Sequence, residues 1–579
     1  MKSEDEITVR NRQGVFIGVT VAVIVVSGLL FFFPENPENN VKQPELRAQV
    51  IIPRTSSPRK ATPPAGNSEP TFSRRPTSPY RNSSQGQIVR NRSATPNRDE
   101  IWQVIYLGEK RIGYSHTKFQ KLGSGSDTRI HVTSELQMSV LRFGQVTRMS
   151  VRSESVEQTN GDLLSFNIVN NNGRTISRME GKVRGGQLLL KTIQNGQIER
   201  RFFPWRAGIK SPLYQDRLLR SQPMKPKEIR QFETFLPETG RISKIRLAAG
   251  GYQNVRLRNG KSRTLLRVRV TQSTSPNDIV DVFLDERGSP VLSNSAFVGK
   301  TMSHYTVTRS EALEAIAGAE LDLGVSTLIR VPIIPKAHGR RQIVYRIYMN
   351  NGDPAKFIPQ SDTQKVRRID DNTVDVAVSA TKYPNRPLHV RVDRKYSAPS
   401  RFLQSSDPRV REHAQRAAGY DRNPIRVAIK MEKYVHQKIR DKNFSTAMAS
   451  AAEVARQMEG DCTEHAVLLA AMLRASGVPS RVAIGLVYVP RVSSFGAHMW
   501  TEAWLGGKWI PFDASFGTGG IGPAHIKLAD ASLADNDNSP ATVFVPLMNV
   551  LGRWRIEVRS VDGKPFSTTG SPPLREVNR

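Results

Sequence analysis

The chain has 579 residues, of which 38% are hydrophobic and 24% charged, with a mean hydropathy of −0.43. This length suggests several domains, and the negative mean hydropathy argues against a polytopic membrane protein. The net charge of +33 favours anionic partners, such as anionic lipid, surface polysaccharide, cell-wall polymer or nucleic acid, and does not choose among them.

An uncharged apolar segment covers Val15–Phe33. At 1.5 Å per residue it nearly spans a hydrocarbon core of about 30 Å, so we expect a transmembrane anchor. Basic residues precede it and acidic residues follow it, which predicts a cytoplasmic tail at 1–14 and the bulk of the chain outside the membrane. A cleaved signal peptide is the alternative, but its apolar region would be shorter and would end in small residues.

Residues 34–98 are rich in Pro, Ser, Asn and Arg and poor in large apolar side chains, which predicts a disordered linker. Eleven basic residues and only two acidic ones lie between Lys42 and Arg98. Two interpretations stay open: the linker is a solvated tether, or it also rests on anionic polymers of the cell envelope.

Residues 99–310 show alternating apolar and polar positions, for example from Val132 to Val140. This period of two predicts a β-rich domain of mostly antiparallel strands. We expect a short helix at 311–319 and a second, smaller β-rich domain at 325–395, in which 343–348 is the clearest strand.

From about residue 400 the pattern becomes helical. Asn423 and Pro424 are typical of the N-cap and first position of a helix, and another helix is expected at 448–459. The last segment, 536–579, is expected to hold a C-terminal strand, with a mobile tail from 562 onward.

Cys462 is the only cysteine in the chain and opens an apolar helix. Asp461 is a good N-cap, and Glu464 completes a capping-box pattern, so Cys462 falls at the first helical position. There the helix dipole and the unpaired N–H groups favour a thiolate. The same N–H groups, including that of Cys462, could stabilise an oxyanion.

A histidine and an aspartate follow on two predicted strands, 492–504 and 508–513, joined by a two-residue turn at Gly506–Gly507. In that register Trp500 faces Asp513 and His498 faces Ser515. His498 and Asp513 are then diagonal neighbours about 7–8 Å apart at the backbone. An aspartate in that place can orient the imidazole, which leaves its other nitrogen for Cys462.

Simpler interpretations exist for each residue alone. A cysteine on an apolar helix is usually core filler, and a strand histidine is often only hydrogen-bonded. Cys462 and His465 could share a metal with His498 or Asp461, but their intervals are not those of a zinc ribbon or finger. We therefore expect no metal, and assign Glu464 and His465 to capping or local packing.

Three segments together resemble the bacterial transglutaminase-like family, which has the papain-like α+β fold: Gly460–Pro479, His498–Glu502 and Trp509–Asp513. The resemblance covers about 400–535. The segment His525–Leu528 is similar to the membrane-anchored bacterial members, and the upstream β-rich region is similar, less specifically, to their exported β domains.

The resemblance implies Cys462 as nucleophile, His498 as general base and acid, and Asp513 as the residue that orients it. It makes Gln457 a candidate second oxyanion donor, although an exposed helix residue is the simpler interpretation. Trp500 is expected to form a wall of the site. The calcium sites of animal members have no counterpart in this sequence, so no cofactor is expected.

These observations predict a multidomain, membrane-anchored enzyme that performs acyl transfer or hydrolysis on amides of envelope proteins or peptides. The alternative is a non-catalytic envelope scaffold or binding protein with the same fold. A nucleic-acid-binding role is disfavoured because the bulk of the chain is expected outside the membrane.

Overall fold

The computed structural model describes residues 99–567 except 143–144, 173–174, 195–196, 316–320, 351, 385–389, 441–448 and 536–542. The predicted anchor at 15–33 and the predicted linker at 34–98 therefore lie outside the described residues. Within the described part, no helix combines the length and apolarity needed to cross a membrane.

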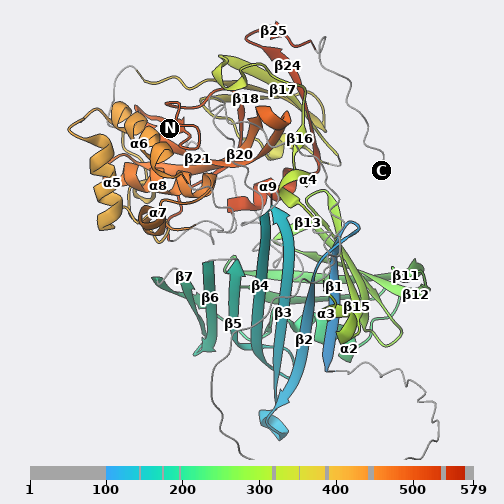
Figure 1. Ribbon diagram of the computed structural model, residues 1–579. Helices are drawn as coiled ribbons and strands as arrows, with labels where there is room; N and C mark the ends of the chain where they lie inside the picture. The colour runs from blue at the N-terminus through green and yellow to red at the C-terminus, as the bar shows by residue number, and fades with distance from the viewer. Residues whose placement is uncertain are drawn as a thin grey trace, which may run out of the picture. The chain divides into compact units, whose positions relative to one another are not determined.

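Residues 100–307 form a sheet of fifteen strands, in the order β8-β7-β6-β5-β4-β3-β2-β1-β15-β14-β13-β12-β11-β10-β9 (Figure 1). The strands are β1 (Glu100–Leu107), β2 (Lys110–Leu122), β3 (Arg129–Arg142), β4 (Gln145–Gln158), β5 (Leu163–Asn172), β6 (Thr175–Arg184), β7 (Gln187–Gln194), β8 (Gln197–Pro204), β9 (Ile209–Lys210), β10 (Ile229–Leu236), β11 (Arg241–Arg256), β12 (Ser262–Gln272), β13 (Ser275–Leu284), β14 (Pro290–Phe297) and β15 (Lys300–Val307). Helix α2 (Tyr214–Ser221) lies between β9 and β10 in the chain.

The predicted β-rich character of this region is confirmed. Apart from the parallel β9–β10 pair, its described pairs are antiparallel, and chain neighbours are usually sheet neighbours. In β3, Val132, Leu136 and Val140 are buried, whereas Gln137 is exposed, as the period of two requires. One side of β3 therefore packs into the core, and the other side faces solvent.

The helix expected at 311–319 begins earlier and is shorter. Helix α3 (Arg309–Leu313) starts after Thr308, because the Thr308 side chain and Glu311 form a reciprocal capping box. Helix α4 (Leu323–Ser326) follows and is capped by Asp322. Residues 316–320 are outside the described part.

A second sheet has the order β18-β19-β17-β24-β25. Its strands are β17 (Gln342–Met349), β18 (Gln364–Arg368), β19 (Thr373–Ser379), β24 (Trp554–Val561) and β25 (Lys564–Pro565). The expected strand at 343–348 is therefore present, and it pairs with β24 from the far end of the chain, for example Ile347 with Ile556. This pairing joins segments that the linear sequence places in separate regions.

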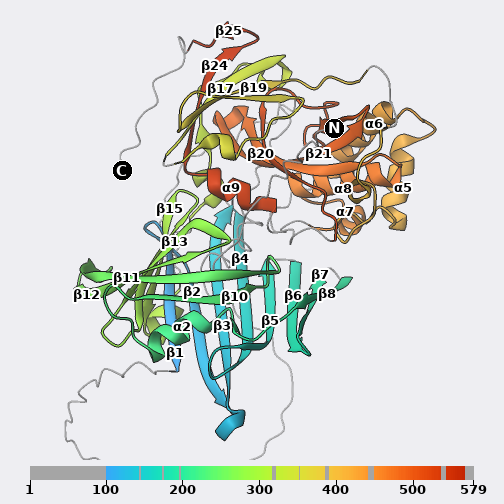
Figure 2. The same cartoon turned by 180° about the vertical axis from the view of Figure 1, so that it is seen from behind.

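The third sheet carries the candidate site, in the order β16-β21-β20-β23, with β22 paired to β21. Its strands are β16 (Ile329–Arg330), β20 (Ser480–Val489), β21 (Ser494–Leu505), β22 (Lys508–Phe512) and β23 (His525–Ala531). The helices of this region are α5 (Pro408–Ala418), α6 (Pro424–Lys438), α7 (Ala451–Gln457), α8 (Cys462–Ala475) and α9 (Val545–Val550). Figures 1 and 2 show α5, α6, α7 and α8 gathered beside β20 and β21.

Local signals set where these helices begin. The Asn423 side chain accepts hydrogen bonds from Ile425 N and Arg426 N, and Pro424 is the first residue of α6, as predicted. Helix α7 is shorter than the predicted 448–459.

Helix α8 is deeply buried, since every residue from Cys462 to Arg474 is buried. It packs on β21, where Thr501 Oγ1 donates a hydrogen bond of 2.9 Å to the carbonyl oxygen of Ala466. Residues 466–473 are apolar on all sides of the helix, a pattern that is expected in such a fully enclosed place.

The β21–β22 hairpin has the predicted turn and register. Gly506 and Gly507 have φ angles of 60° and 79°, and Leu505 pairs with Lys508. Such a turn needs positive φ at both positions, which glycine adopts without strain. The ladder ends at the Thr501–Phe512 pair, however, so the expected Trp500–Asp513 and His498–Ser515 pairs are wrong.

Candidate active site

Cys462 is the first residue of α8 and is fully buried. The capping box predicted for this helix is present: Asp461 Oδ1 accepts from Thr463 N at 2.8 Å, and Glu464 Oε2 accepts from Asp461 N at 2.9 Å. Burial and the Asp461 carboxylate next to it raise the pKa of Glu464 well above its ordinary value. The thiol therefore sits at a well-defined helix N-terminus.

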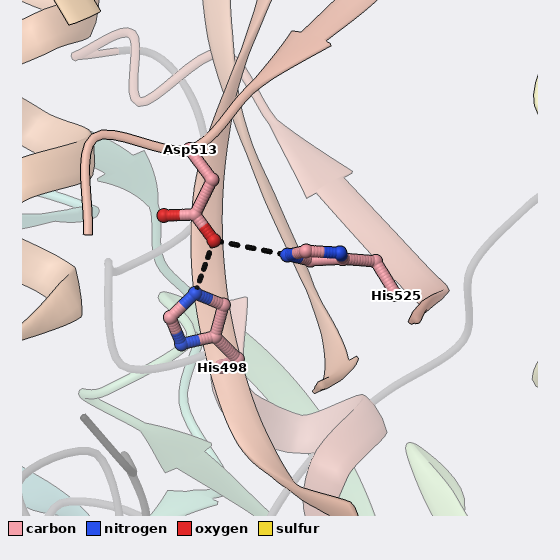
Figure 3. A group of neighbouring side chains, drawn as sticks. All are labelled: His498, Asp513 and His525. Carbon is pink, nitrogen blue, oxygen red and sulfur yellow. Dashed lines mark hydrogen bonds and ion pairs between the residues drawn. The ribbon is translucent and has the colours of Figure 1, made fainter. Parts of the chain in front are cut away.

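His498 and Asp513 meet in the core (Figure 3). His498 Nε2 lies 2.7 Å from Asp513 Oδ2, and the side chains are 0% and 1% exposed. An ionised carboxylate can only accept, so Nε2 of His498 is the donor and carries the proton. That tautomer leaves Nδ1 with the lone pair that a general base needs.

Asp513 is brought to His498 by a turn and not by the strand ladder. The chain turns directly after β22, and the Asp513 carbonyl accepts from Phe516 N at 3.1 Å and Gly517 N at 2.9 Å. Asp513 Oδ1 accepts from Ser515 N at 2.9 Å, which leaves Oδ2 to face the histidines.

A second histidine binds the same carboxylate oxygen. His525 Nε2 lies 2.9 Å from Asp513 Oδ2, from the first residue of β23 (Figure 3). Sequence reasoning placed His525 only in a family-like segment and gave it no role. The available signal was a histidine at the start of a strand that follows Asp513 closely in the chain, but its side-chain partner depends on sheet order.

The two histidines decide the charge of Asp513. Burial alone would raise the pKa of this carboxyl, but the charge and hydrogen bond of His498 and the hydrogen bond of His525 hold it well below its ordinary value. Burial lowers the pKa of His525 despite its bond to Asp513. Asp513 is therefore an anion across the range in which proteins work, whereas burial disfavours the charged form of His525.

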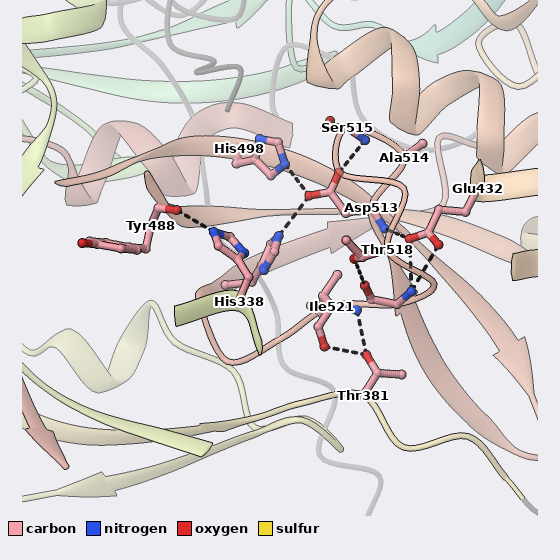
Figure 4. Close-up of polar contacts among 12 residues, drawn as sticks. His338, Thr381, Glu432, Tyr488, His498, Asp513, Ala514, Ser515, Thr518 and Ile521 are labelled. Atoms are coloured by element: carbon pink, nitrogen blue, oxygen red, sulfur yellow. Dashed lines mark hydrogen bonds and ion pairs between the residues drawn. The ribbon is translucent and has the colours of Figure 1, made fainter. Parts of the chain in front are cut away.

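The loop that carries Asp513 is held by a buried glutamate of α6 (Figure 4). Glu432 Oε1 accepts from Asp513 N at 2.8 Å, and Oε2 accepts from Gly519 N at 2.6 Å. Gly520 N donates to both oxygens at 3.2 Å. Burial raises the pKa of Glu432 to about 8, although these N–H groups favour its charged form. No sequence pattern pointed to this residue.

Aromatic rings enclose the histidines. Trp500 stacks on His498 with ring centroids 6.3 Å apart, and it packs edge-on against His525 with centroids 5.4 Å apart. It therefore lies beside both histidines, where a wall of the site is expected. Phe516 and His338 complete the ring cluster, with Phe516 6.1 Å from His498 and His338 5.6 Å from His525.

Two other candidates lie apart from this cluster. Gln457 is exposed at the C-terminal end of α7, which agrees with the simpler interpretation of it. His465 lies one helical turn after Cys462, and its Nδ1 is 2.7 Å from the Asp461 carbonyl oxygen. Burial lowers the pKa of His465 to about 4, so it serves the packing of the helix start as a neutral group.

His498, Asp513 and His525 are also the one described group of residue types that could hold a metal ion, with ligand atoms within 4.8 Å of one another. Two ligands of a tetrahedral Zn²⁺ ion stand roughly 3.3 Å apart. The contacts of 2.7 and 2.9 Å are instead hydrogen-bond distances. This geometry fits a carboxylate with two imidazole donors better than a metal cage.

Residues 411–514 match the family model of the Transglutaminase-like superfamily. The match includes Cys462, His498 and Asp513 of this transglutaminase-like domain. It begins within α5, covers α6 to α8 and the β21–β22 hairpin, and stops before His525.

Comparisons with other proteins are less informative. No curated protein matches the chain. One similar solved structure is a candidate cysteine protease from Cytophaga hutchinsonii, which is 17% identical over 39% of this chain and 91% of that one, with a TM-score of 0.26. Another is a β-barrel-like protein from Brucella abortus with a domain of unknown function, DUF1849, which is 14% identical over 37% of this chain and 98% of that one, with a TM-score of 0.28. A candidate protease from Parabacteroides distasonis is 10% identical over 62% of this chain and 68% of that one, with a TM-score of 0.18.

Proposed function

We propose that the chain is a membrane-anchored cysteine enzyme that acts outside the cytoplasm on protein or peptide amides through a thioester. The observation that carries this proposal is the buried bond between His498 Nε2 and Asp513 Oδ2, in a domain where Cys462 opens a capped helix. The match of that domain to the Transglutaminase-like superfamily supports it.

In the proposed reaction, the Cys462 thiol gives its proton to Nδ1 of His498. The resulting thiolate attacks the amide carbonyl carbon, and the carbonyl oxygen becomes an oxyanion. The N–H groups at the start of α8 favour both anions. His498 then gives its Nδ1 proton to the leaving nitrogen, the C–N bond breaks, and an amine or ammonia departs. Asp513 keeps Nε2 of the ring protonated and holds its orientation throughout.

The thioester is then resolved by an acceptor. His498 takes a proton from an amine or from water, the acceptor attacks the thioester carbon, and the thiolate leaves. An amine acceptor gives an isopeptide bond, whereas water gives hydrolysis. Envelope proteins or wall peptides are the proposed substrates, since the anchor at 15–33 would expose the domain there, and the basic linker at 34–98 would favour anionic envelope polymers.

A non-catalytic scaffold is the second candidate, and the full burial of Cys462 favours it. A buried cysteine packs well as a small apolar side chain without any reaction. In this alternative, salt-sensitive envelope binding through the linker would be the activity of the protein, and the triad would be a remnant of the fold.

Thiol alkylation of the full chain separates the two candidates, because Cys462 is the only thiol. We expect iodoacetamide to react rapidly well below pH 8.5, the ordinary thiol pKa being about 8.5. The His498→Ala and Asp513→Ala variants should react at least about ten-fold more slowly at pH 6, since they lose the imidazole or its orientation. Mass spectrometry of the alkylated peptide gives the rates.

Slow reaction in all three proteins, with circular dichroism showing that each is folded, would favour the scaffold. Removal of 34–98 then provides the complementary test. Loss of salt-sensitive binding to envelope material, with alkylation unchanged, would assign binding to the linker alone.

A further inference from the structure

His525 shares Asp513 with His498 because of the way three strands assemble. β21 and β23 flank β20 on opposite sides, with His498 opposite Gly485 and His525 opposite Val487. Gly485 and Val487 are two apart on β20, so the histidines project from the same face of the sheet. Asp513, at the turn after β22, accepts from both.

The pairing has a direct electrostatic consequence. A carboxylate that already accepts a hydrogen bond has part of its charge compensated, and it attracts a second partner less strongly. His525 therefore competes with His498 for the charge of Asp513. It also restricts rotation of the carboxylate, since Oδ2 must satisfy two donors while Ser515 N holds Oδ1.

We propose that His525 is a positioning residue for the proposed reaction, and this inference rests on the proposed function. By donating Nε2–H to Oδ2 of Asp513, it holds the carboxylate toward His498. It also weakens the pull of that carboxylate on the charged imidazole that accompanies a thiolate. His525 should thus lower the pH at which the thiolate–imidazolium pair of Cys462 and His498 is lost.

Other titratable groups face this carboxylate from the neighbouring elements. They are His338 in the 3-10 turn Ala337–Gly339, Glu432 and His436 of α6, and His465 of α8. Burial lowers the pKa of His338 to about 4, so it is neutral in the useful range, as is His465. Glu432 titrates near pH 8, but it is common to all the variants below, so its effect cancels in their differences.

The experiment compares alkylation of Cys462 in the full chain by iodoacetate and by iodoacetamide. The anionic reagent is favoured while the neighbouring imidazole is charged, so the rate ratio falls as that proton leaves. We expect His525→Phe to raise the pH midpoint of this fall by roughly half to one unit, because Asp513 then acts on His498 alone. Asp513→Asn should lower the midpoint.

Two further variants complete the test. His525→Gln keeps an N–H donor and should return the midpoint toward the wild-type value. His338→Gln is the matched control, since His338 packs against His525 but binds the Tyr488 carbonyl, at 2.9 Å, and not Asp513. An unchanged or lowered midpoint in His525→Phe, or the same shift in His338→Gln, would overturn the inference.

A second measurement does not depend on access to the thiol. In the full chain labelled with ¹⁵N-histidine, NMR should show both His498 and His525 protonated at Nε2 when neutral, with each signal assigned by its Gln variant. A proton on Nδ1 of His525 would refute the shared carboxylate. If wild-type alkylation is slow and insensitive to His498→Ala but both Nε2 protons are seen, the proposed function fails while the His525 contact stands.

Discussion

At the residue scale, the site depends on packing so close that one position has no room for a side chain. Gly485 lies between the two histidine-bearing strands, and a Cβ atom there would lie 2.0 Å from the Ile526 carbonyl oxygen and 2.9 Å from Cη2 of Trp500. Its lack of a side chain, and not its φ angle, is the reason for glycine at this position. The close approach lets β23 bring His525 beside Asp513.

We therefore predict that Gly485→Ala destabilises the transglutaminase-like domain by about 1–3 kcal/mol, the usual cost of overpacking. The melting temperature from scanning calorimetry should fall. Gly251→Ala is the control, because a Cβ there would meet nothing within 4 Å. Equal melting temperatures for the two variants would contradict this explanation.

At the element scale, a helix positions the loop on which the proposed chemistry depends. Glu432 projects from α6 and accepts hydrogen bonds from Asp513 N, Gly519 N and Gly520 N, so the start and end of the turn after β22 are fixed to one carboxylate. Tyr383 also donates to the Gly519 carbonyl, and Ile521 N donates to Thr381 Oγ1 at 3.0 Å (Figure 4).

The raised pKa of Glu432 predicts a pH-dependent stability. Its pKa is about 8 in the folded chain against 4.5 ordinarily, so the folded state holds the proton more tightly. Its contribution is complete below about pH 4.5 and declines as the pH rises toward 8. Glu432→Gln should show a flatter decline in free energy of unfolding across this range, despite losing hydrogen bonds at every pH.

Urea denaturation at several pH values measures that slope. Glu412→Gln is the matched control, because Glu412 is exposed on α5 and pairs only with Arg416 among the described contacts. The prediction fails if the curves of wild type and Glu432→Gln run parallel between pH 5 and 8.

At the scale of the whole molecule, distant parts of the chain support the candidate site. β24 pairs with β17 in the small sheet, and Tyr345 of β17 donates to the Pro523 carbonyl at 2.9 Å, just before His525. Gln364 of β18 exchanges two hydrogen bonds, of 2.9 and 2.8 Å, with the Lys527 backbone. The end of the chain thus helps to hold β23.

We predict that Ile556→Ala, which removes a buried side chain of β24, costs about 2–5 kcal/mol locally. Hydrogen exchange should accelerate in β17 and in 523–528, which β17 and β18 contact. Arg555→Ala removes an exposed neighbour and should stay within about 0.5 kcal/mol of wild type. Unchanged exchange at 523–528 in Ile556→Ala would show that β23 does not depend on the small sheet.

The sequence by itself determined the features that depend on near neighbours. The cap and first position of α8, the start of α6, the two-residue turn and the register of β22 follow from hydrogen bonds and φ preferences within a few residues. The same short-range patterns predicted that this strand extends to Asp513, whereas β22 ends at Phe512. The turn that follows is held by Glu432 from a distant helix.

Only the tertiary structure decided the partners of Asp513. Sheet order brings β23 beside β20, and so places His525 on the carboxylate that His498 also binds. It likewise joins β24 to β17 across some two hundred residues of chain. Such contacts arise from the packing of elements far apart in sequence. No local pattern predicts them, because the alternation of apolar and polar residues in a strand is the same whichever strand it pairs with.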